Sequence, residues 1–501
     1  MKNTLRAAFV IFLIGHYTTI ALGQNIQMVN GKFMNGTNTF VPVVMNYDVQ
    51  LRYRGAKSAE EVYVSPAHSY FSTPNIKESC DDPKDCRQMI ASHFKEIKAM
   101  GCNTLRIVGH YSYSGYDHLD YPAMWSVGGW WGDTYYPELA PPYELHFKLI
   151  NDILTLADQA GLKVILLTGG KKVDQSAYLK AFTTYLEVLA ARFKNDPRLL
   201  AFDLLNEPEY FHGSDVIADA SGKSTRKEAY TKEDVRIMVD EWVGAIRKHS
   251  RTLITIGLTA SGTVFQWDPE VLDVDFFSYH LYPKTGNPNL YDIYNTEIYY
   301  LGHNIKKPWI IGETGFSASD LKKGKWLGEG ADRKFYPNDG TTQEQLDFAR
   351  KTSRYCMDCG ALGYSWWQYH EVHWEPDYAV VDSTHKLKPV TQAFAEMAAY
   401  TPNPENCRKP ETYYNATGAK KGGVSKRIRS ADGKPITNAV IVTNIKQGQR
   451  GRTFTAENGK FKVKGNGFIN YIIVSAPGYK SVNIPRIKLF FKRTIRLQPA
   501  G

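Results

Sequence analysis

The chain alternates short, continuous apolar runs with longer segments whose apolar residues recur at helical spacing. Apolar runs of four to eight residues bounded by turn signals are typical of strands buried on both faces, and apolar positions three and four apart indicate amphipathic helices. The predicted strands cover residues 40–47, 103–108, 163–168, 201–208, 252–257, 274–280, 308–313 and 363–368. The predicted helices cover residues 87–100, 145–160, 178–193, 232–248, 293–305, 343–357 and 389–400.

This regular alternation predicts an α/β fold, a (β/α)₈ TIM barrel with insertions. The alternative is a doubly wound open sheet. No glycine-rich phosphate loop follows the first predicted strand, and the candidate polar residues lie at the ends of several strands. Both observations favour the barrel.

The last part of the chain has a different pattern. Short strands are predicted at residues 422–425, 439–443, 459–463 and 471–475, separated by Asp-Gly, Asn-Gly and Pro-Gly turns. This spacing is typical of a small antiparallel β-sandwich. We therefore expect a barrel over residues 24–402, a linker rich in Pro, Asn and Thr over 403–419, and a sandwich over 420–501.

The N-terminus has the pattern of a secretory signal. Lys2 and Arg6 precede an apolar segment that ends in small residues, which predicts a signal peptide over residues 1–23 with cleavage before Gln24. No later run approaches the roughly 18 apolar residues that a membrane helix needs, and no cysteine follows the cleavage site. The expected location is secreted or periplasmic.

Composition and charge bound the class of protein. The chain has 501 residues, and 43% of them are hydrophobic. This is enough for a sizeable core, so we do not expect an intrinsically disordered protein. From Arg408 onward there are 20 Lys and Arg against 3 Asp and Glu, a net charge of +17, so residues 1–407 carry −7 of the total of +10. Such a basic segment could contact an anionic surface or polymer. Its charges are scattered through strands with few aromatics, so a solvated face is the simpler interpretation and no nucleic acid is expected.

Six cysteines in an exported chain allow 15 pairings if all of them form disulfides. Cys80 and Cys86 flank a short polar loop and are the pair to test first. Cys356 and Cys359 have a two-residue spacing, but no second pair stands nearby to complete a zinc site. We expect these two to be buried or bridged structural cysteines.

Two glutamates occupy matching places in the predicted barrel. Glu207 ends the fourth strand before Pro208, and Glu313 ends the seventh strand shortly before Gly315. Either residue alone would be explained as a loop residue. Strand ends of a barrel face one cleft, and retaining glycoside hydrolysis needs an acid and a nucleophilic carboxylate about 5 Å apart. The pair therefore predicts a glycosidase site.

Four further residues support this prediction. Arg106 interrupts an apolar strand and needs a carboxylate partner, and it could keep a nucleophile ionised. Asn206 is placed to bind a substrate hydroxyl. His280 and Tyr282 alternate at the end of the sixth strand, so they lie on one face and could orient the two acids. We expect Glu207 to have the higher pKa of the two acids, because an acid catalyst must be protonated.

Aromatic residues gather near the same predicted face. Trp367, at the end of the eighth strand, is expected to form the floor beneath the reacting sugar, and Trp366 to lie in the core. Ten aromatics lie between residues 111 and 143, including Trp130 and Trp131. With Trp374, these two are candidates for sugar subsites, since indole rings offer flat apolar faces and an N–H donor.

These residues together resemble clan A glycoside hydrolases, most closely family 5, which contains cellulases and β-mannanases. The resemblance covers about residues 30–400. It implies Glu207 of Leu-Asn-Glu-Pro as acid/base and Glu313 of Ile-Gly-Glu-Thr-Gly as nucleophile. It also implies that Asn206, Arg106, His280, Tyr282 and Trp367 contact or support the substrate.

One departure concerns the third strand. Many family members end it with a His, whereas this chain has Thr168 followed by two glycines. Some mannanase-like members also lack that His, and the eighth strand is similar to theirs, which favours mannan. The C-terminal segment resembles carboxypeptidase regulatory-like β-sandwich modules, so we expect a spacer, a stabiliser or an attachment module.

The sequence thus predicts a secreted retaining endo-β-glycanase that hydrolyses β-mannan or β-glucan and needs no metal or organic cofactor. One alternative is a non-catalytic glycan-binding or adhesion protein on the same barrel. Such a protein would have no need for both carboxylates beside Arg106, His280 and Tyr282. The other alternative is an exo-acting β-glycosidase, which sequence does not distinguish from an endo-acting enzyme.

Overall fold

The structure is a computed structural model. It describes residues 25–53, 62–66, 80, 82–109, 113–114, 130–131, 134–135, 144–169, 176–208, 231–283, 290–320, 324–327, 334–337, 339–371, 377–382, 384–415, 423–445, 450–464, 469–491 and 493–500. The expected signal peptide, Trp374 and most of the aromatic stretch 111–143 lie outside these ranges.

Eight parallel strands form a closed barrel, because the last of them pairs back onto the first through Trp366 and Met45. In order around the barrel they are β4 (Val43–Tyr53), β6 (Thr104–Val108), β10 (Lys163–Leu167), β11 (Leu199–Asn206), β12 (Leu253–Thr259), β13 (Phe277–His280), β14 (Trp309–Glu313) and β17 (Tyr364–Trp366). The predicted barrel is confirmed. The open-sheet alternative is wrong, since an open sheet would leave β4 and β17 unpaired with each other.

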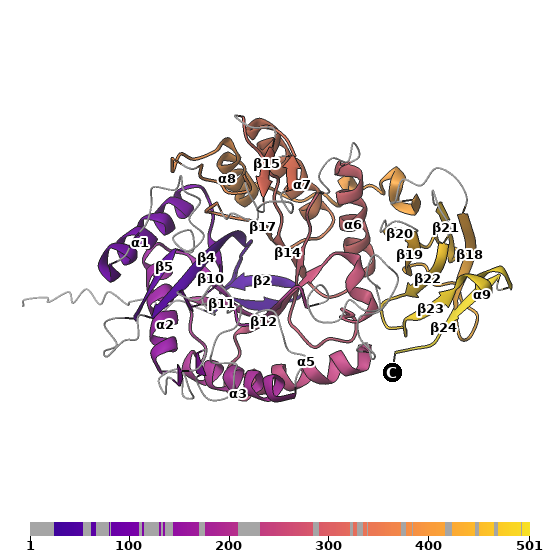
Figure 1. The fold of residues 1–501 in the computed structure, drawn as a ribbon, viewed down its shortest axis with the longest axis horizontal. Helices are drawn as coiled ribbons and strands as arrows, with labels where there is room; N and C mark the ends of the chain where they lie inside the picture. Colours follow the sequence, from indigo (N-terminus) through magenta and orange to yellow (C-terminus); the bar gives the residue numbers. More distant parts are fainter. Residues whose placement is uncertain are drawn as a thin grey trace, which may run out of the picture.

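Helices surround the barrel (Figure 1). They are α1 (Pro83–Ala99), α2 (Glu144–Gln159), α3 (Ser176–Arg192), α5 (Lys232–Arg247), α6 (Leu290–Asn304), α7 (Thr342–Asp358) and α8 (Gln392–Ala399). Two of them begin at capping boxes, Thr231 with Asp234 for α5 and Thr341 with Glu344 for α7. Each box satisfies backbone N–H groups that a helix start would otherwise leave free.

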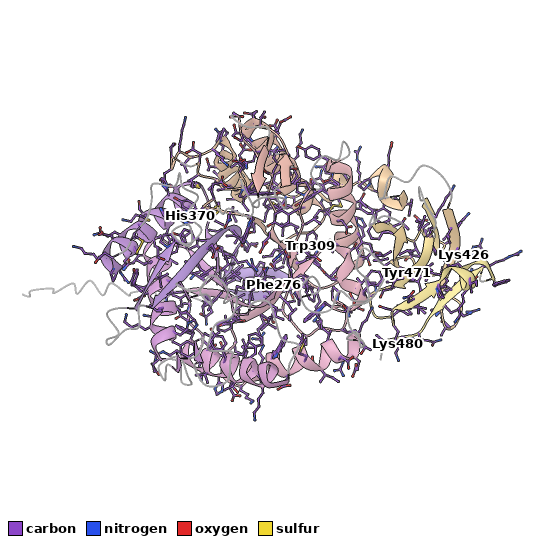
Figure 2. All side chains as sticks on the ribbon, in the orientation of Figure 1. Phe276, Trp309, His370, Lys426, Tyr471 and Lys480 are labelled. Atoms are coloured by element: carbon purple, nitrogen blue, oxygen red, sulfur yellow. A yellow bond between two sulfur atoms is a disulfide. The ribbon has the colours of Figure 1, made fainter. Side chains whose placement is uncertain are left out.

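A hairpin closes the N-terminal end of the barrel. Strands β1 (Gln27–Val29) and β2 (Lys32–Asn35), with the short β3 (Asn38–Thr39), place Phe33 against Phe276, with ring centroids 5.0 Å apart. Figure 2 labels Phe276. Phe33 and Phe276 belong to a buried apolar cluster with Val44, Ala201 and Ile310, which come from three barrel strands. The lower part of the barrel interior is therefore packed with apolar side chains.

Shorter strands extend from the barrel. They are β5 (Val62–Pro66), β7 (Tyr113–Ser114), β8 (Trp130–Trp131), β9 (Thr134–Tyr135), β15 (Gly324–Leu327) and β16 (Lys334–Pro337). β5 pairs antiparallel with the C-terminal part of β4, which extends beyond the barrel. β8 with β9, and β15 with β16, form two-stranded ribbons.

The cysteines are structural. Cys80 and Cys86 form a disulfide, which confirms the predicted pair, and Cys359 bridges to Cys407. Cys356 and Cys102 are buried free thiols. The expectation that Cys356 and Cys359 are buried or bridged is confirmed.

The C-terminal part holds two facing sheets, of order β21-β18-β24 and β20-β19-β22-β23. Their strands are β18 (Gly423–Ser430), β19 (Val440–Ile445), β20 (Arg450–Phe454), β21 (Lys460–Lys464), β22 (Ile469–Ser475), β23 (Val482–Pro485) and β24 (Thr494–Leu497), with the short helix α9 (Arg486–Phe491) before β24. The small β-sandwich is confirmed. Its pairs are antiparallel apart from β18 with β24, which is parallel.

The sandwich packs closely onto the barrel part of the chain (Figure 1). Phe454 of β20 stacks on Tyr300 of α6, with ring centroids 4.5 Å apart, and belongs to the same core cluster as the barrel helices. Beside this contact, the ammonium of Lys232 lies 2.7 Å from Asp268 and donates to the carbonyl of Ala476 at 2.9 Å. A buried ion pair thus fixes the sandwich to the barrel.

The connecting segment is also attached to the barrel. It forms two short 3₁₀ helices, η8 (Pro404–Asn406) and η9 (Glu411–Asn415). Cys407 between them is bridged to Cys359 at the end of α7, and Tyr413 is buried against Phe454 at 4.9 Å between ring centroids. Among the helices that the structure describes, none is both long and apolar enough to cross a membrane.

The buried pair between Lys232 and Asp268 gives a first prediction. Asp268 is fully buried, and its carboxylate also accepts from the N–H of Gly478 at 2.8 Å. Lys232→Ala leaves this carboxylate buried without its counter-ion, so we expect the free energy of unfolding to fall by about 3–5 kcal/mol in urea titrations. Lys248→Ala, which removes a solvent-exposed pair with Glu187, is the control and should change it little. A loss below about 1 kcal/mol for Lys232→Ala would contradict the role of this pair.

Candidate active site

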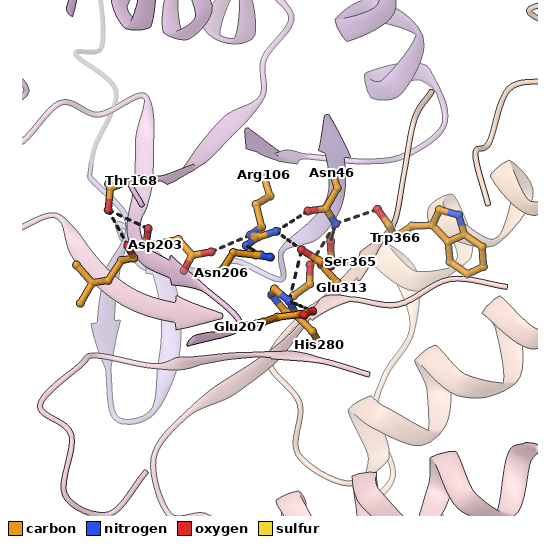
Figure 3. Close-up of polar contacts among 12 residues, drawn as sticks. Asn46, Arg106, Thr168, Asp203, Asn206, Glu207, His280, Glu313, Ser365 and Trp366 are labelled. Atoms are coloured by element: carbon orange, nitrogen blue, oxygen red, sulfur yellow. Dashed lines mark hydrogen bonds and ion pairs between the residues drawn. The ribbon is translucent and has the colours of Figure 1, made fainter. Parts of the chain in front are cut away.

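Arg106 lies at the centre of a polar layer above the apolar lower interior (Figure 3). It comes from β6 and is fully buried. Its guanidinium donates to Asp203 at 2.8 Å, to Asn46 at 3.1 Å, to Glu313 at 2.5 Å and to Asn206 at 2.8 Å. Burial by itself would lower the pKa of Arg106, but the carboxylates of Asp203 and Glu313 outweigh burial and raise it. The predicted carboxylate partner of Arg106 is therefore present twice.

Two irregularities in the strands aim these side chains at Arg106. The pairing of β11 with β12 shifts between Asp203 and Asn206, so both side chains face the interior although they are three residues apart. The pairing of β13 with β14 shifts in the same way just before Glu313. Strict alternation would turn one residue of each set away from the interior, and a bulge re-aims it.

His280 fills a space made by two glycines. A Cβ at Gly257 would lie 2.8 Å from the imidazole, and a Cβ at Gly312 would lie 3.2 Å from it. The imidazole Nδ1 is 2.9 Å from Glu207 and 3.4 Å from Glu313. Burial is the main cause that lowers the pKa of His280, to about 4. His280 is therefore neutral near pH 7, and it must carry its proton on Nδ1 to donate to either carboxylate.

Glu207 stands at the end of β11 with its backbone in the left-handed region, at φ +47°. Its N–H donates to the carbonyl of Gly257 at 2.9 Å, which holds this conformation in place. For a residue with a Cβ the conformation costs roughly 1–2 kcal/mol. Burial raises the pKa of Glu207 to about 7, against a smaller lowering by Arg106. The residue can thus hold a proton at neutral pH.

Both oxygens of Glu313 accept hydrogen bonds. Oε1 accepts from Arg106, and Oε2 accepts from the hydroxyl of Tyr282 at 2.9 Å. Both oxygens of this carboxylate are therefore held in place, one of them by a cation. An oxygen of Glu313 and an oxygen of Glu207 lie within 4.8 Å of each other. The barrel therefore brings together a carboxyl that can be protonated and a carboxylate held by an arginine.

Glu207, His280 and Glu313 also have the spacing of a possible metal site, with one ligand atom from each within 4.8 Å. The guanidinium of Arg106 donates to Glu313 at 2.5 Å. A metal ion on Glu313 would lie close to this fixed positive charge, and His280 would have to give up its proton on Nδ1 to bind it there. The residues present suit a pair of carboxyl groups better than a cation.

The remaining predicted residues are only partly described. The side-chain oxygen of Asn206 accepts from Arg106, so its amide N–H₂ is left for another acceptor. Trp367 is half-buried, and its backbone N–H donates to the carbonyl of Thr314, next to Glu313, at 2.7 Å. Trp366 is fully buried, as expected. Trp130 and Trp131 form β8, but their side chains lie outside the described part of the chain, as does Trp374.

Sequence reasoning missed three polar residues of this layer. Asn46 of β4 accepts from Arg106 and donates to Ser365 and to the carbonyls of Gly312 and Trp366. Asp203 is the buried partner of Arg106. Each interrupts an apolar run, just as Arg106 does, and that signal could have identified both residues.

The third missed residue is Asp48, two positions after Asn46 on the interior-facing side of β4. It is 8% exposed and packs against the backbone of Gly109, where a Cβ would lie 2.0 Å from Oδ1. Within the described residues its carboxyl makes no ion pair or hydrogen bond. Burial raises the pKa of Asp48 to about 7. A buried acid with a raised pKa thus lies at the same end of the barrel as Glu207 and Glu313.

Comparison with known proteins identifies a family. The profile of "Cellulase (glycosyl hydrolase family 5)" matches residues 71–370, more than half of the chain. A search of curated proteins found no match. The matched range contains Arg106, Glu207, His280 and Glu313.

Several solved structures are similar to parts of this chain at low sequence identity. The GH5_18 enzyme of Streptomyces cattleya in complex with GlcNAc is 14% identical, with 69% of this chain and 79% of that chain covered and a TM-score of 0.45. The exo-beta-1,4-mannosidase Op5Man5 of Opitutaceae bacterium strain TAV5 is 15% identical, with 81% and 64% covered and a TM-score of 0.48. A beta-D-glucuronidase of Dictyoglomus thermophilum is 16% identical, with 76% and 54% covered and a TM-score of 0.42. These likenesses do not identify a substrate.

The buried carboxyl of Asp48 predicts a pH-dependent stability. Its pKa in the folded chain, about 7, exceeds the ordinary value of 3.8, so between these values the folded state binds the extra proton. Stability therefore falls as pH rises from about 4 to 7, by on the order of 4 kcal/mol at most. Asp48→Asn should raise the melting temperature at pH 8 and leave it unchanged below pH 4.

The control for this measurement is Asp273→Asn, whose carboxyl is 85% exposed. We expect its melting temperature to follow that of the wild type across the pH range. Equal melting curves of wild type and Asp48→Asn at pH 8 would show that the Asp48 carboxylate carries no such penalty.

Proposed function

The chain belongs to glycosyl hydrolase family 5, and we propose that it is a retaining endo-β-glycanase acting on β-mannan or β-glucan. The observation that carries the retaining mechanism is the distance between Glu207 and Glu313, whose oxygens lie within 4.8 Å. Retaining enzymes hold their two carboxyl groups about 5 Å apart, and inverting enzymes hold them about 6.5–9.5 Å apart to admit a water.

Glu207 acts first as the acid in this proposal. Its proton passes to the glycosidic oxygen while Glu313 attacks the anomeric carbon, so the bond to the leaving sugar breaks and a glycosyl ester on Glu313 forms. Water then enters, Glu207 accepts its proton, and the hydroxyl displaces the ester. Glu207 is then protonated again and Glu313 is again a free carboxylate, so the cycle closes without a cofactor.

The surrounding residues support these two roles. Arg106 and Tyr282 hold the two oxygens of Glu313, which orients it for attack. Neutral His280 donates to Glu207 without adding a charge that would favour its ionised form. The free amide of Asn206, the carboxyl of Asp48 and the indole of Trp367 are the groups that we propose contact the sugar.

Endo action and the polymer are inferred from the sequence. The aromatic stretch between residues 111 and 143 favours several sugar subsites. The likeness of the eighth strand to that of mannanase-like family members favours a mannan-like chain. A single terminal-sugar site would not need so many rings.

We also propose that the protein is exported after removal of residues 1–23, and that residues 24–402, 403–419 and 420–501 are the barrel, the connection and the sandwich. The likeness of the sandwich to carboxypeptidase regulatory-like modules supports a stabilising or attachment role. The ion pair of Lys232 and Asp268 favours stabilisation.

Glu313→Gln tests the proposed nucleophile. Hydrolysis of β-mannan, glucomannan, cellulose and xylan should reveal at least one polymer that the wild type cuts into oligosaccharides of mixed length. We expect Glu313→Gln to lose ~10³-fold or more of kcat, because an amide cannot form the glycosyl ester. Glu187→Gln, an exposed acid on α3, is the matched control and should retain full activity.

Other outcomes of this screen have definite meanings. Equal activity of Glu313→Gln and wild type would overturn the assignment of Glu313. Binding of a glycan without cleavage would favour the adhesion alternative, and monosaccharide as the first product would favour an exo-acting glycosidase.

The pKa of Glu207 predicts the alkaline side of the pH profile. The acid form of Glu207 is lost as pH rises through about 7, so kcat/KM should fall above that pH. In Glu207→Gln this limb near pH 7 should be absent, and activity on the polymer should drop by ~10²–10⁴-fold. A dinitrophenyl glycoside needs no proton on its leaving group and should be much less affected. An unchanged alkaline limb in Glu207→Gln would assign the acid to another residue.

A further inference from the structure

The outer face of the three-stranded C-terminal sheet is basic. In β18, Ile428 points into the sandwich core, so Arg427 and Arg429 on either side of it point outward. We call "basic face" the outward-facing basic residues whose side chains are described on these three strands, which are Arg427, Arg429, Lys460, Lys462 and Arg496.

The basic face places like charges directly opposite each other. Lys460 pairs with Arg427 across β21 and β18, and Arg429 pairs with Arg496 across β18 and β24. Opposed like charges destabilise a sheet. In the described part of the chain, Lys434 pairs with Asp432 in the turn after β18, and no acid pairs with Arg427, Lys460 or Lys462. The positive charge of the face is therefore open to an outside partner.

Helix α9 adds exposed apolar side chains beside this face. Ile487 is 74% exposed and Phe491 is 86% exposed, the two highest values for large apolar side chains in the described chain. They are four residues apart and so share one side of the helix, while Leu489 on the other side is buried in the sandwich core. Phe491 lies two residues before Arg493, whose carbonyl accepts from the N–H of Arg427 at 3.3 Å. The C-terminal end of α9 thus lies next to β18, which carries part of the basic face.

This combined surface lies at the end of the molecule away from the barrel. α9, β18 and β24 form the outer part of the sandwich (Figure 1), and Lys426 of β18 marks this end in Figure 2. Residues 1–407 carry a net charge of −7, against +17 for the remainder. An anionic surface would therefore attract the sandwich and repel the barrel.

We propose that the basic face together with Ile487 and Phe491 binds the surface of an anionic lipid bilayer. Lys and Arg bind anionic headgroups, and exposed apolar side chains next to them enter the boundary between headgroups and acyl chains. A nucleic acid or an anionic polysaccharide would use the charges but would gain little from Ile487. A second copy of this chain would bring two basic faces together. This proposal does not rest on the proposed hydrolysis.

Vesicle sedimentation tests the proposal with the full chain. The folded protein is mixed with vesicles of phosphatidylcholine alone, or with a quarter of the lipid replaced by phosphatidylglycerol, at low and high salt. We expect sedimentation with the anionic vesicles at low salt, at least ~10-fold weaker binding to the neutral vesicles, and loss of binding at high salt.

Variants separate the two parts of the surface. The triple variant Arg427→Glu, Lys460→Glu and Lys462→Glu should lose ~10²-fold or more of the binding to anionic vesicles. The double variant Ile487→Ser and Phe491→Ser should lose about 10-fold while keeping the salt dependence. Ile237→Ser, also an exposed apolar residue, and Lys306→Glu, an exposed charge, are the matched controls and should bind as the wild type does.

Three results would overturn the proposal. The first is no sedimentation with either vesicle, including the case in which heparin or DNA binds the basic face instead. The second is equal binding to neutral and anionic vesicles. The third is unchanged binding of the Ile487→Ser and Phe491→Ser variant, which would leave a purely electrostatic contact with no lipid insertion.

Discussion

The buried guanidinium of Arg106 is the constraint on which the active end of the barrel depends. A charge inside a protein must be paired and hydrogen-bonded, because its lost hydration is not otherwise replaced. Its four bonds reach three other strands, through Asn46 on β4, through Asp203 and Asn206 on β11, and through Glu313 on β14. The same interaction that satisfies Arg106 therefore fixes the position of the proposed nucleophile.

Regular strands alone could not build this arrangement. The bulges at Asn206 and Glu313 and the left-handed backbone of Glu207 each depart from ideal geometry within a few residues of the two acids. Departures of this kind cost stability and persist where the surrounding structure holds them. Here the hydrogen bonds to Arg106 hold the two bulges, and the hydrogen bond from Glu207 to Gly257 holds the left-handed backbone. The contacts that position the two acids are therefore also the contacts that maintain the strained backbone.

Sequence periodicity was sufficient for the fold and for the strand ends that carry Arg106, Glu207, His280 and Glu313, because buried parallel strands have a strong apolar signal. It did not reveal Asn46, Asp203 or Asp48, since a polar residue within an apolar run shows that a partner is needed without showing which one. The bulge that turns Asn206 inward depends on pairing with β12, and the attachment of the sandwich depends on Lys232 meeting Asp268. Both are contacts between segments that are distant in the sequence, and the local pattern of apolar and polar residues does not specify such contacts.

The charges around Arg106 also suit both halves of the proposed reaction. In the resting site, Arg106 is paired with Asp203 and Glu313, and burial raises the pKa of Glu207 by more than Arg106 lowers it. When Glu313 becomes a neutral ester, one of the two balancing charges is gone, and the field of Arg106 at Glu207 grows. That change lowers the pKa of Glu207 at the step in which it must accept a proton from water. Burial lowers the pKa of His280 to about 4, so near pH 7 it adds no charge beside Glu207 in either step. One fixed cation can thereby favour the acid form of Glu207 in the first step and the base form in the second.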